Sequence, residues 1–257
     1  MRILRAIRLS VKLGLNIEKK TATPISSMSE MLEHVSSARL WDESNKLFLA
    51  GFARPTWNLM IETHVAPHLF AETCRSLKNN NSMFESFIDK ALESTDNRIA
   101  NQKPVTPAFL FAVFLWQPLI DNMERLRAKG LPPQEAMHKA ASKVLDSQRA
   151  TIAIPKRFSM VMREIWSLQH RFFNRKKRNV DSLLAHPKFR AAYDFLCLRA
   201  GDDQSLIELS EWWTQIQDVS PDKKHKMILA ASPQQRKSRA KGRKRQPRKR
   251  YRNANNQ

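Results

Sequence analysis

The segment PAFLFAVFLWQPLI, from Pro107 to Ile120, constrains the fold more than any other part of this sequence. It is the longest apolar run, but it is shorter than the roughly 18 residues that a membrane-spanning helix needs, and Pro118 interrupts it. Thr106 is a suitable helix cap, and Pro107 suits the first helical position. The segment therefore predicts a helix buried in the protein core, and we expect no membrane association.

The rest of the composition favours helix over sheet. Only five of the 257 residues are glycine, and long stretches are rich in Leu, Ala, Glu, Lys, Arg and Gln. The sequence shows no strand pattern and no internal repeat. Cys74 and Cys197 have no paired spacing, which predicts two buried free thiols and a reducing, cytoplasmic location. We expect an all-α fold, built as a helical array.

Prolines mark most of the expected helix starts. They predict helices over 133–149, 155–176 and 187–200. Asp202 or Asp203 is expected to cap a last helix before the C-terminal tail. Further helices are expected near 1–13, 28–36, 37–51, 54–70 and 82–101, with residues 16–27 as a connection.

The net charge of +21 is concentrated at the C-terminal end. Residues 223–257 contain fourteen Lys and Arg and no acidic residue, whereas residues 1–222 carry 31 basic and 24 acidic residues. Like charges at that density oppose compaction, so residues 221–257 are predicted to form a disordered basic tail. Such a tail binds polyanions by releasing their counterions, although a merely solubilising tail is the alternative. The RNA-binding residues predicted in it are Arg236, Lys237, Arg243, Lys244, Arg245, Arg248, Lys249 and Arg250.

The opening stretch, MRILRAIRLSVKLGLN, predicts an amphipathic helix with an unusual start. No capping residue or acidic residue stands ahead of it, and its cations lie at the positive end of the helix dipole. Its apolar residues Ile3, Leu4, Ile7 and Val11 fall on one arc, and Arg2, Arg5, Arg8 and Lys12 fall on another.

No cluster of residues typical of a catalytic domain is found in the sequence. It contains no G-x-S-x-G, no phosphate-binding glycine loop and no H-E-x-x-H motif. His64 and His68 are four residues apart, but Pro67 lies between them and no third ligand is near, which favours loop and packing roles. Of Asp42 and Glu43, only one can face inward. We therefore predict no catalytic residue and no metal site in this chain.

The expected helix from Pro155 carries a basic face beside its core-facing residues. A basic face with nearby aromatic residues can follow a phosphate backbone and stack bases, whereas an ordinary solvated helix face is the alternative. Trp212 and Trp213 are expected to be one core and one rim residue. The RNA-binding residues predicted here are Lys156, Arg157, Arg171, Arg175, Lys176, Lys177 and Arg178.

Several segments resemble those of a known superfamily. MRILRAIRLSVKLGL resembles the neck helix of the class II nucleotidyltransferases, which include bacterial poly(A) polymerases and tRNA CCA-adding enzymes, and ARLWDESNKLFLAG resembles the start of their body. AIPKRF, IWSLQHR, HPKFRAAYDFLCLRA and EWWTQIQ are similar to the C-terminal region of the bacterial poly(A) polymerases. Leu9 stands where the family usually has Phe. The resemblance implies a neck and the start of the body over 1–51, as RNA- and nucleotide-binding helices. It implies a helical body, the C-terminal region of the poly(A) polymerases, over 52–220 and the RNA-binding tail over 221–257.

The resemblance implies the RNA-binding neck, body and tail of an enzyme that adds AMP from ATP to RNA 3′ ends. In the family, an acidic residue, a proline and a head with a phosphate loop and magnesium-binding aspartates precede the neck. Met1 is therefore expected to lie within a longer reading frame that was interrupted or cut. We expect this chain alone to bind RNA without catalysis and to need no cofactor, whereas ATP and magnesium belong to the full-length family.

The resemblance also assigns roles to three arginines of the opening helix. Arg2 matches the family arginine that reads the base of the incoming nucleotide. Arg5 and Arg8 match basic positions of the same motif, where they contact the nucleotide or pair with carboxylates of the body. The nucleotide-binding residues predicted are therefore Arg2, Arg5 and Arg8.

Two other interpretations remain open. One is a fragment of a CCA-adding enzyme, which would prefer tRNA over unstructured RNA. The other is a free-standing helical RNA-binding protein without catalysis. In a variant of the first interpretation, a separate nucleotidyltransferase head chain docks onto the Arg2 helix in trans.

Overall fold

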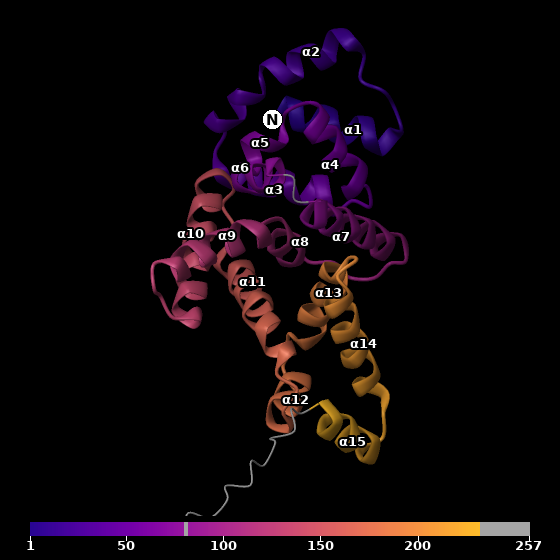
Figure 1. Ribbon diagram of the computed structural model, residues 1–257. Helices are drawn as coiled ribbons and strands as arrows, with labels where there is room; N and C mark the ends of the chain where they lie inside the picture. The colour runs from indigo at the N-terminus through magenta and orange to yellow at the C-terminus, as the bar shows by residue number, and fades with distance from the viewer. Residues whose placement is uncertain (80–81, 232–257) are drawn as a thin grey trace, which may run out of the picture.

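The computed structural model describes residues 1–79 and 82–231, and over these ranges it is helical, with no strand (Figure 1). This confirms the all-α helical array. The helices that form the larger part of the molecule are α1 (Arg2–Leu13), α2 (Lys19–Ser27), η1 (Ser29–His34), α3 (Ser37–Phe48), α4 (Ala53–Glu62), α5 (Ala66–Leu69), α6 (Ala71–Lys78), α7 (Ser82–Ala100), α8 (Pro107–Phe114), α9 (Trp116–Ala128) and α10 (Pro133–Thr151). The remaining helices are α11 (Lys156–Gln169), η2 (His170–Phe173), α12 (Lys177–Leu184), α13 (Phe189–Ala200), α14 (Gln204–Asp218) and α15 (Pro221–Ala231).

Helix α8 lies at the centre of the larger hydrophobic core, as its apolar sequence predicts. Phe111 and Phe114 pack against aromatic rings from α3, α4 and the start of α6. The indole Nε1 of Trp166, on α11, donates a hydrogen bond to the Ala112 carbonyl at 3.0 Å. Among the described residues, no helix combines the length and apolar character that crossing a membrane requires.

The apolar run that contains α8 is divided into two helices. Helix α8 ends at Phe114, and α9 begins at Trp116. Pro118 has no backbone N–H and its ring clashes with the carbonyl four residues earlier, which here belongs to Phe114. The proline that interrupts the run in sequence therefore also divides the helix.

A second, smaller core joins η2 and helices α12 to α15. Trp213 of α14 is fully buried and donates its Nε1–H to the Phe172 carbonyl at 2.9 Å. The ring of Phe172 meets the Trp213 indole edge to face at 5.1 Å. Trp212 is only half-buried, which confirms that one tryptophan of the pair lies in the core and the other at the rim. In Figure 1 this part extends away from the larger body at the end opposite α1 and α2.

Several helices differ from those predicted. The segment near 54–70 forms two helices, α4 and α5, and α6 was not predicted. Residues 16–27, expected to be a connection, contain α2, whose periodicity is weak because only Ile25 is buried. The helix from Pro155 ends at Gln169 rather than 176, because the chain turns through η2 to bury Phe172 and Asn179 bonds to the Asn174 carbonyl at 2.6 Å. Residues 221–231, assigned to the basic tail, form α15, which buries Ile228.

Several smaller predictions are confirmed. Asp203 caps α14 by accepting hydrogen bonds from the backbone N–H groups of Ser205 and Leu206. Cys74 and Cys197 are both free, as predicted, but only Cys74 is buried; the predicted burial is wrong for Cys197, which is half-buried. Glu43 is the member of its acidic pair that faces inward, at 2% exposure.

Candidate nucleic-acid interface

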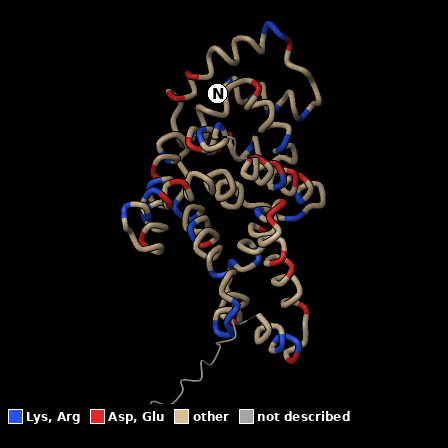
Figure 2. The backbone as a smooth tube through the Cα atoms, viewed as in Figure 1, with Lys and Arg blue, Asp and Glu red and all other residues tan. Residues whose placement is uncertain are grey.

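The start of α12 carries three exposed cations, and we call Lys176, Lys177 and Arg178 the α12 basic cluster (Figure 2). Lys176 is the N-cap residue, and the first turn contains no acidic residue. Free backbone N–H groups and the helix dipole already make this end of a helix positive, so cations here lower the stability of the helix. The same arrangement attracts an anion strongly, since a phosphate meets both the dipole and the side-chain charges.

An aromatic residue lies three residues before this cluster in the sequence. Phe173, the last residue of η2, is 57% exposed, which is unusual for a phenylalanine beside a well-packed core. An exposed ring near several cations is the combination by which proteins hold single-stranded nucleic acid, with stacking on the ring and charge pairing to the phosphates. Phe173 does not stand out in the sequence, because it follows the core residue Phe172 and shares its apolar character.

Two of the predicted RNA-binding arginines are held in place by the protein itself. Arg171 donates hydrogen bonds to Asn179 Oδ1 at 3.2 Å and to Ser182 Oγ at 3.1 Å, which ties η2 to α12. The Arg175 guanidinium lies 5.2 Å from the ring centre of Trp212. Both side chains are half-buried, so they fix the geometry around the α12 basic cluster while keeping part of their charge at the surface.

Lys156 and Arg157 lie at the other end of α11, about 20 Å along the helix from η2 at 1.5 Å per residue. Both are exposed, and the Arg157 guanidinium lies over the Phe158 ring at 4.8 Å. Between the two ends, Arg163 donates to Ser142 Oγ at 3.2 Å. Burial lowers the pKa of Arg163, and the nearby charge of Arg149 lowers it further. The structure therefore divides the predicted RNA-binding residues of the segment 155–178 into two groups, one at each end of α11.

One arginine of α1 approaches a buried carboxylate of α3. Helix α1 packs through Leu4 and Ile7, and Arg5 Nε lies 4.0 Å from Oε1 of the buried Glu43. Lys46 Nζ lies 3.0 Å from the same oxygen. Arg5 therefore pairs with a carboxylate of the body, which is one of the two roles expected for it.

Among Glu43 and the α1 arginines, two buried side-chain atoms have no hydrogen-bond partner within the described residues. They are Glu43 Oε2 and Arg8 Nε, and both are buried. Arg2 differs, since it is exposed and free to reach a ligand.

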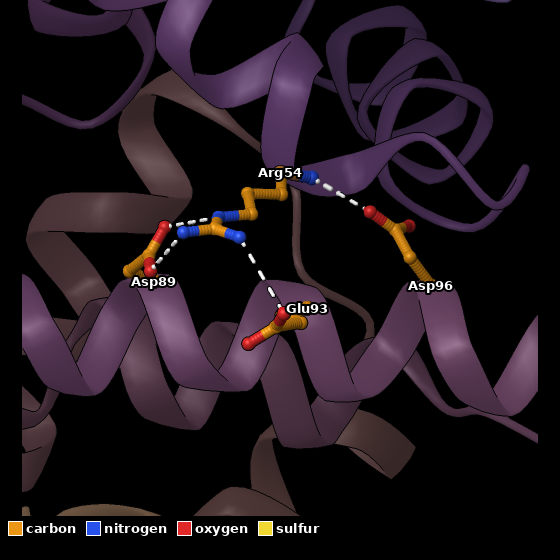
Figure 3. Close-up of polar contacts among 4 residues, drawn as sticks. All are labelled: Arg54, Asp89, Glu93 and Asp96. Carbon is orange, nitrogen blue, oxygen red and sulfur yellow. Dashed lines mark hydrogen bonds and ion pairs between the residues drawn. The ribbon is translucent and has the colours of Figure 1, made fainter.

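Arg54 is a basic residue that the protein neutralises (Figure 3). Its Nη2 and Nε donate to the two carboxylate oxygens of Asp89 at 2.7 and 2.5 Å, and Nη1 donates to Glu93 at 3.5 Å. These contacts, led by the hydrogen bonds that Arg54 donates to Asp89, raise the pKa of Arg54. Asp96 accepts from the backbone N–H groups of Ala53 and Arg54 at 2.6 and 3.0 Å, so α7 caps α4. The cluster joins two helices and offers no free cation.

The eight tail residues predicted to bind RNA, Arg236, Lys237, Arg243, Lys244, Arg245, Arg248, Lys249 and Arg250, lie outside the described residues. His68, considered as a metal ligand, instead bonds through Nδ1 to Glu33 at 2.8 Å.

Comparison with known protein families assigns both ends of the chain. The model described as "Polymerase A arginine-rich C-terminus" matches residues 129–252, and the one described as "Probable RNA and SrmB-binding site of polymerase A" matches residues 14–77. The first match includes the α12 basic cluster. The second covers α2 to α6, where the sequence analysis assigned no RNA-binding residue.

Individual relatives agree with these matches. Poly(A) polymerase I of Escherichia coli O6:H1 is 39% identical over 254 residues, which is 96% of this chain and 55% of the relative. The Haemophilus influenzae enzyme of the same name is 36% identical over 231 residues, or 89% of this chain and 51% of the relative. A CCA-adding enzyme of Streptococcus pneumoniae is 27% identical over 124 residues, 48% of this chain and 28% of the relative. This chain spans about half the length of the poly(A) polymerases it matches, and it is homologous to the C-terminal part of the bacterial poly(A) polymerases.

Proposed function

We propose that this chain is the RNA-binding part of a poly(A) polymerase, an enzyme that adds AMP units from ATP to RNA 3′ ends in the cytoplasm. The observation that carries the proposal is the α12 basic cluster, because three cations at a helix N-terminus lower stability unless an anion binds there. Phe173 beside the cluster supplies a stacking surface for a base.

Residues at the start of α1 would contact the incoming nucleotide. Arg2 is exposed and would contact the base of an incoming nucleotide, whereas Arg5 and Arg8 lie against the body and would hold α1 in place. ATP and magnesium would be bound with the phosphate loop and paired aspartates of a nucleotidyltransferase head, whether in one chain or in a separate one. The match over residues 14–77 supports RNA, and the partner protein SrmB that its description names, as ligands of α2 to α6.

The test is binding of a fluorescein-labelled twelve-residue oligo(A) RNA over a range of salt concentrations. Replacing Lys176, Lys177 and Arg178 together with Ala is expected to weaken binding by about tenfold or more at low salt. The slope of log K against log salt should fall by about 2, since each phosphate contact on a single strand contributes about 0.7.

The matched control replaces Arg125, Arg127 and Lys129, three exposed cations in the last turn and C-cap of α9. They carry the same total charge, but they lie where the helix dipole favours cations. Equal losses from the two triple variants would contradict a specific role for α12.

Two further measurements separate the alternatives. The chain with ATP, magnesium and an RNA primer is expected to give no extension; tailing by the chain alone would contradict the division of labour proposed here. Tighter binding of tRNA than of oligo(A) would favour the CCA-adding interpretation, which the weaker and shorter match to such an enzyme supports less well.

A further inference from the structure

A cleft of about 630 Å³ opens between α12, α14 and α15, next to the α12 basic cluster. In Figure 1, α15 lies beside α12 at the end of the molecule farthest from α1 and α2. The volume of the cleft falls within the roughly 300–1,000 Å³ typical of small-molecule sites. One part of its wall is apolar and consists of Leu184, Phe189, Ile216, Val219 and Ile228.

The rim of this cleft carries basic side chains. Lys177 of α12 and His225 of α15 line it, and both side chains are exposed. Lys224 also lines it, but its Nζ lies 2.9 Å from Asp181 Oδ1, and this ion pair joins α15 to α12 across the cleft. Asp181 is the one carboxylate among the lining residues, and it is already paired. The unpaired charge at the rim is therefore positive.

An apolar wall beside an unpaired lysine and an exposed histidine matches a nucleotide, which has an apolar base face and an anionic phosphate. We infer that this cleft holds one nucleotide of a bound single-stranded RNA, with the base against the apolar wall and a phosphate at Lys177 and His225. The inference rests on the proposed function and adds to it a defined position for one base. The carboxylates of an acidic peptide could pair with the basic side chains at the rim, but they would make no contact that favours the apolar wall.

The place of the cleft in the chain supports the same occupant. Helix α15 forms one side of the cleft and ends at Ala231, and the eleven Lys and Arg of residues 232–257 follow directly in the sequence. On the other side, Lys176 and Arg178 flank Lys177. An RNA strand attracted by either basic segment would thus be brought to the cleft.

The experiment compares two probes on the full chain, oligo(A) of twelve residues and inorganic polyphosphate of similar charge, which has no bases. Val219→Trp places a large side chain at the half-buried mouth of the cleft without changing any charge. It is expected to weaken oligo(A) binding by about tenfold, the loss of one stacked base, and to leave polyphosphate binding unchanged.

A second pair of variants covers the case in which Val219→Trp disturbs folding, as judged by circular dichroism. Lys177→Ala with His225→Ala removes the two unpaired rim groups, and Lys223→Ala with Lys226→Ala removes exposed α15 neighbours that neither line the cleft nor belong to the α12 basic cluster. The rim pair is expected to lower oligo(A) affinity several-fold more than the control pair.

The outcomes are distinguishable. If the wild-type chain binds neither probe, the proposed function itself fails. If the wild-type chain binds oligo(A), the inference about the cleft is overturned by wild-type affinity in Val219→Trp, or by equal losses in the two double variants, while RNA binding by the chain stands.

Discussion

At the scale of single residues, Asp203 shows how one carboxylate sets the start of a helix. Hydrogen bonds from the Ser205 side chain and from backbone N–H groups lower the pKa of Asp203. Its contribution to stability is therefore fully present above the carboxyl's unfolded pKa of about 4 and is lost as pH falls through the lower folded value.

Asp203→Ala is thus expected to lower the melting temperature at pH 7, and its difference from wild type should shrink as the pH falls towards 2.5. Asp203→Asn keeps a capping oxygen and should melt close to wild type at neutral pH. Thermal melts followed by circular dichroism at several pH values measure this, and a pH-independent effect of Asp203→Ala would contradict it.

Trp212 and Trp213 form a matched pair with very different surroundings. Trp213→Phe removes the hydrogen bond to the Phe172 carbonyl and leaves a small cavity, so we expect about 2 kcal/mol of lost stability. Trp212 lies at the rim, so Trp212→Phe should lower the free energy of unfolding by about 0.5 kcal/mol or less. Urea unfolding of both variants measures the difference, and similar midpoints would mean that the second core does not depend on this contact.

At the scale of helices, α12 is predicted to trade stability for binding. Lys177→Glu places a negative charge in its first turn and should stabilise the chain by about 0.3–1 kcal/mol at low salt, while it weakens RNA binding. Lys129→Glu, at the C-cap of α9, makes the same charge change at the opposite end of a helix dipole and should destabilise the chain. Both shifts should fade in 0.5 M salt, and equal signs for the two variants would contradict the dipole argument.

The helices could be predicted from sequence where local signals were strong. Pro107 and Pro133 begin helices, and the α8 segment is buried as expected. Sequence reasoning missed α2, which has one buried residue and an internal proline, and it missed the turn at η2. In that turn, the Phe172 carbonyl accepts a hydrogen bond from the Trp213 indole, 41 residues away. In an uninterrupted helix, the same carbonyl would accept a hydrogen bond from a backbone N–H of the helix.

The candidate site was predictable in composition but not in arrangement. The cations of 176–178 are visible in the sequence, whereas their position at a helix N-terminus depends on where α11 ends. Arg171 looked like a free cation, but it bonds to α12, a contact that only the fold creates. The cleft beside α15 could not be foreseen because residues 221–231 looked like part of an extended basic tail.

At the scale of the whole molecule, charge is distributed very unevenly. Residues 232–257 hold eleven Lys and Arg, whereas most of the remaining positive charge is offset by carboxylates. In Figure 2, red and blue are interspersed over most of the described chain, and α12 stands out as blue. Two sources of RNA affinity are therefore expected: the attraction of the many cations in residues 232–257, and the α12 basic cluster with its neighbouring cleft.

Ending the chain at Ala231 should separate the two. Because single-strand contacts contribute about 0.7 each to the salt slope, losing up to eleven cations can lower the slope by as much as about 8. We expect a large loss of oligo(A) affinity at 50 mM salt and a much smaller one at 300 mM, where the tail's attraction is screened. The residual binding should remain sensitive to Lys176→Ala, Lys177→Ala and Arg178→Ala combined. Complete loss of RNA binding in the shortened chain at every salt concentration would mean that the tail alone grips RNA and that the α12 basic cluster has another role.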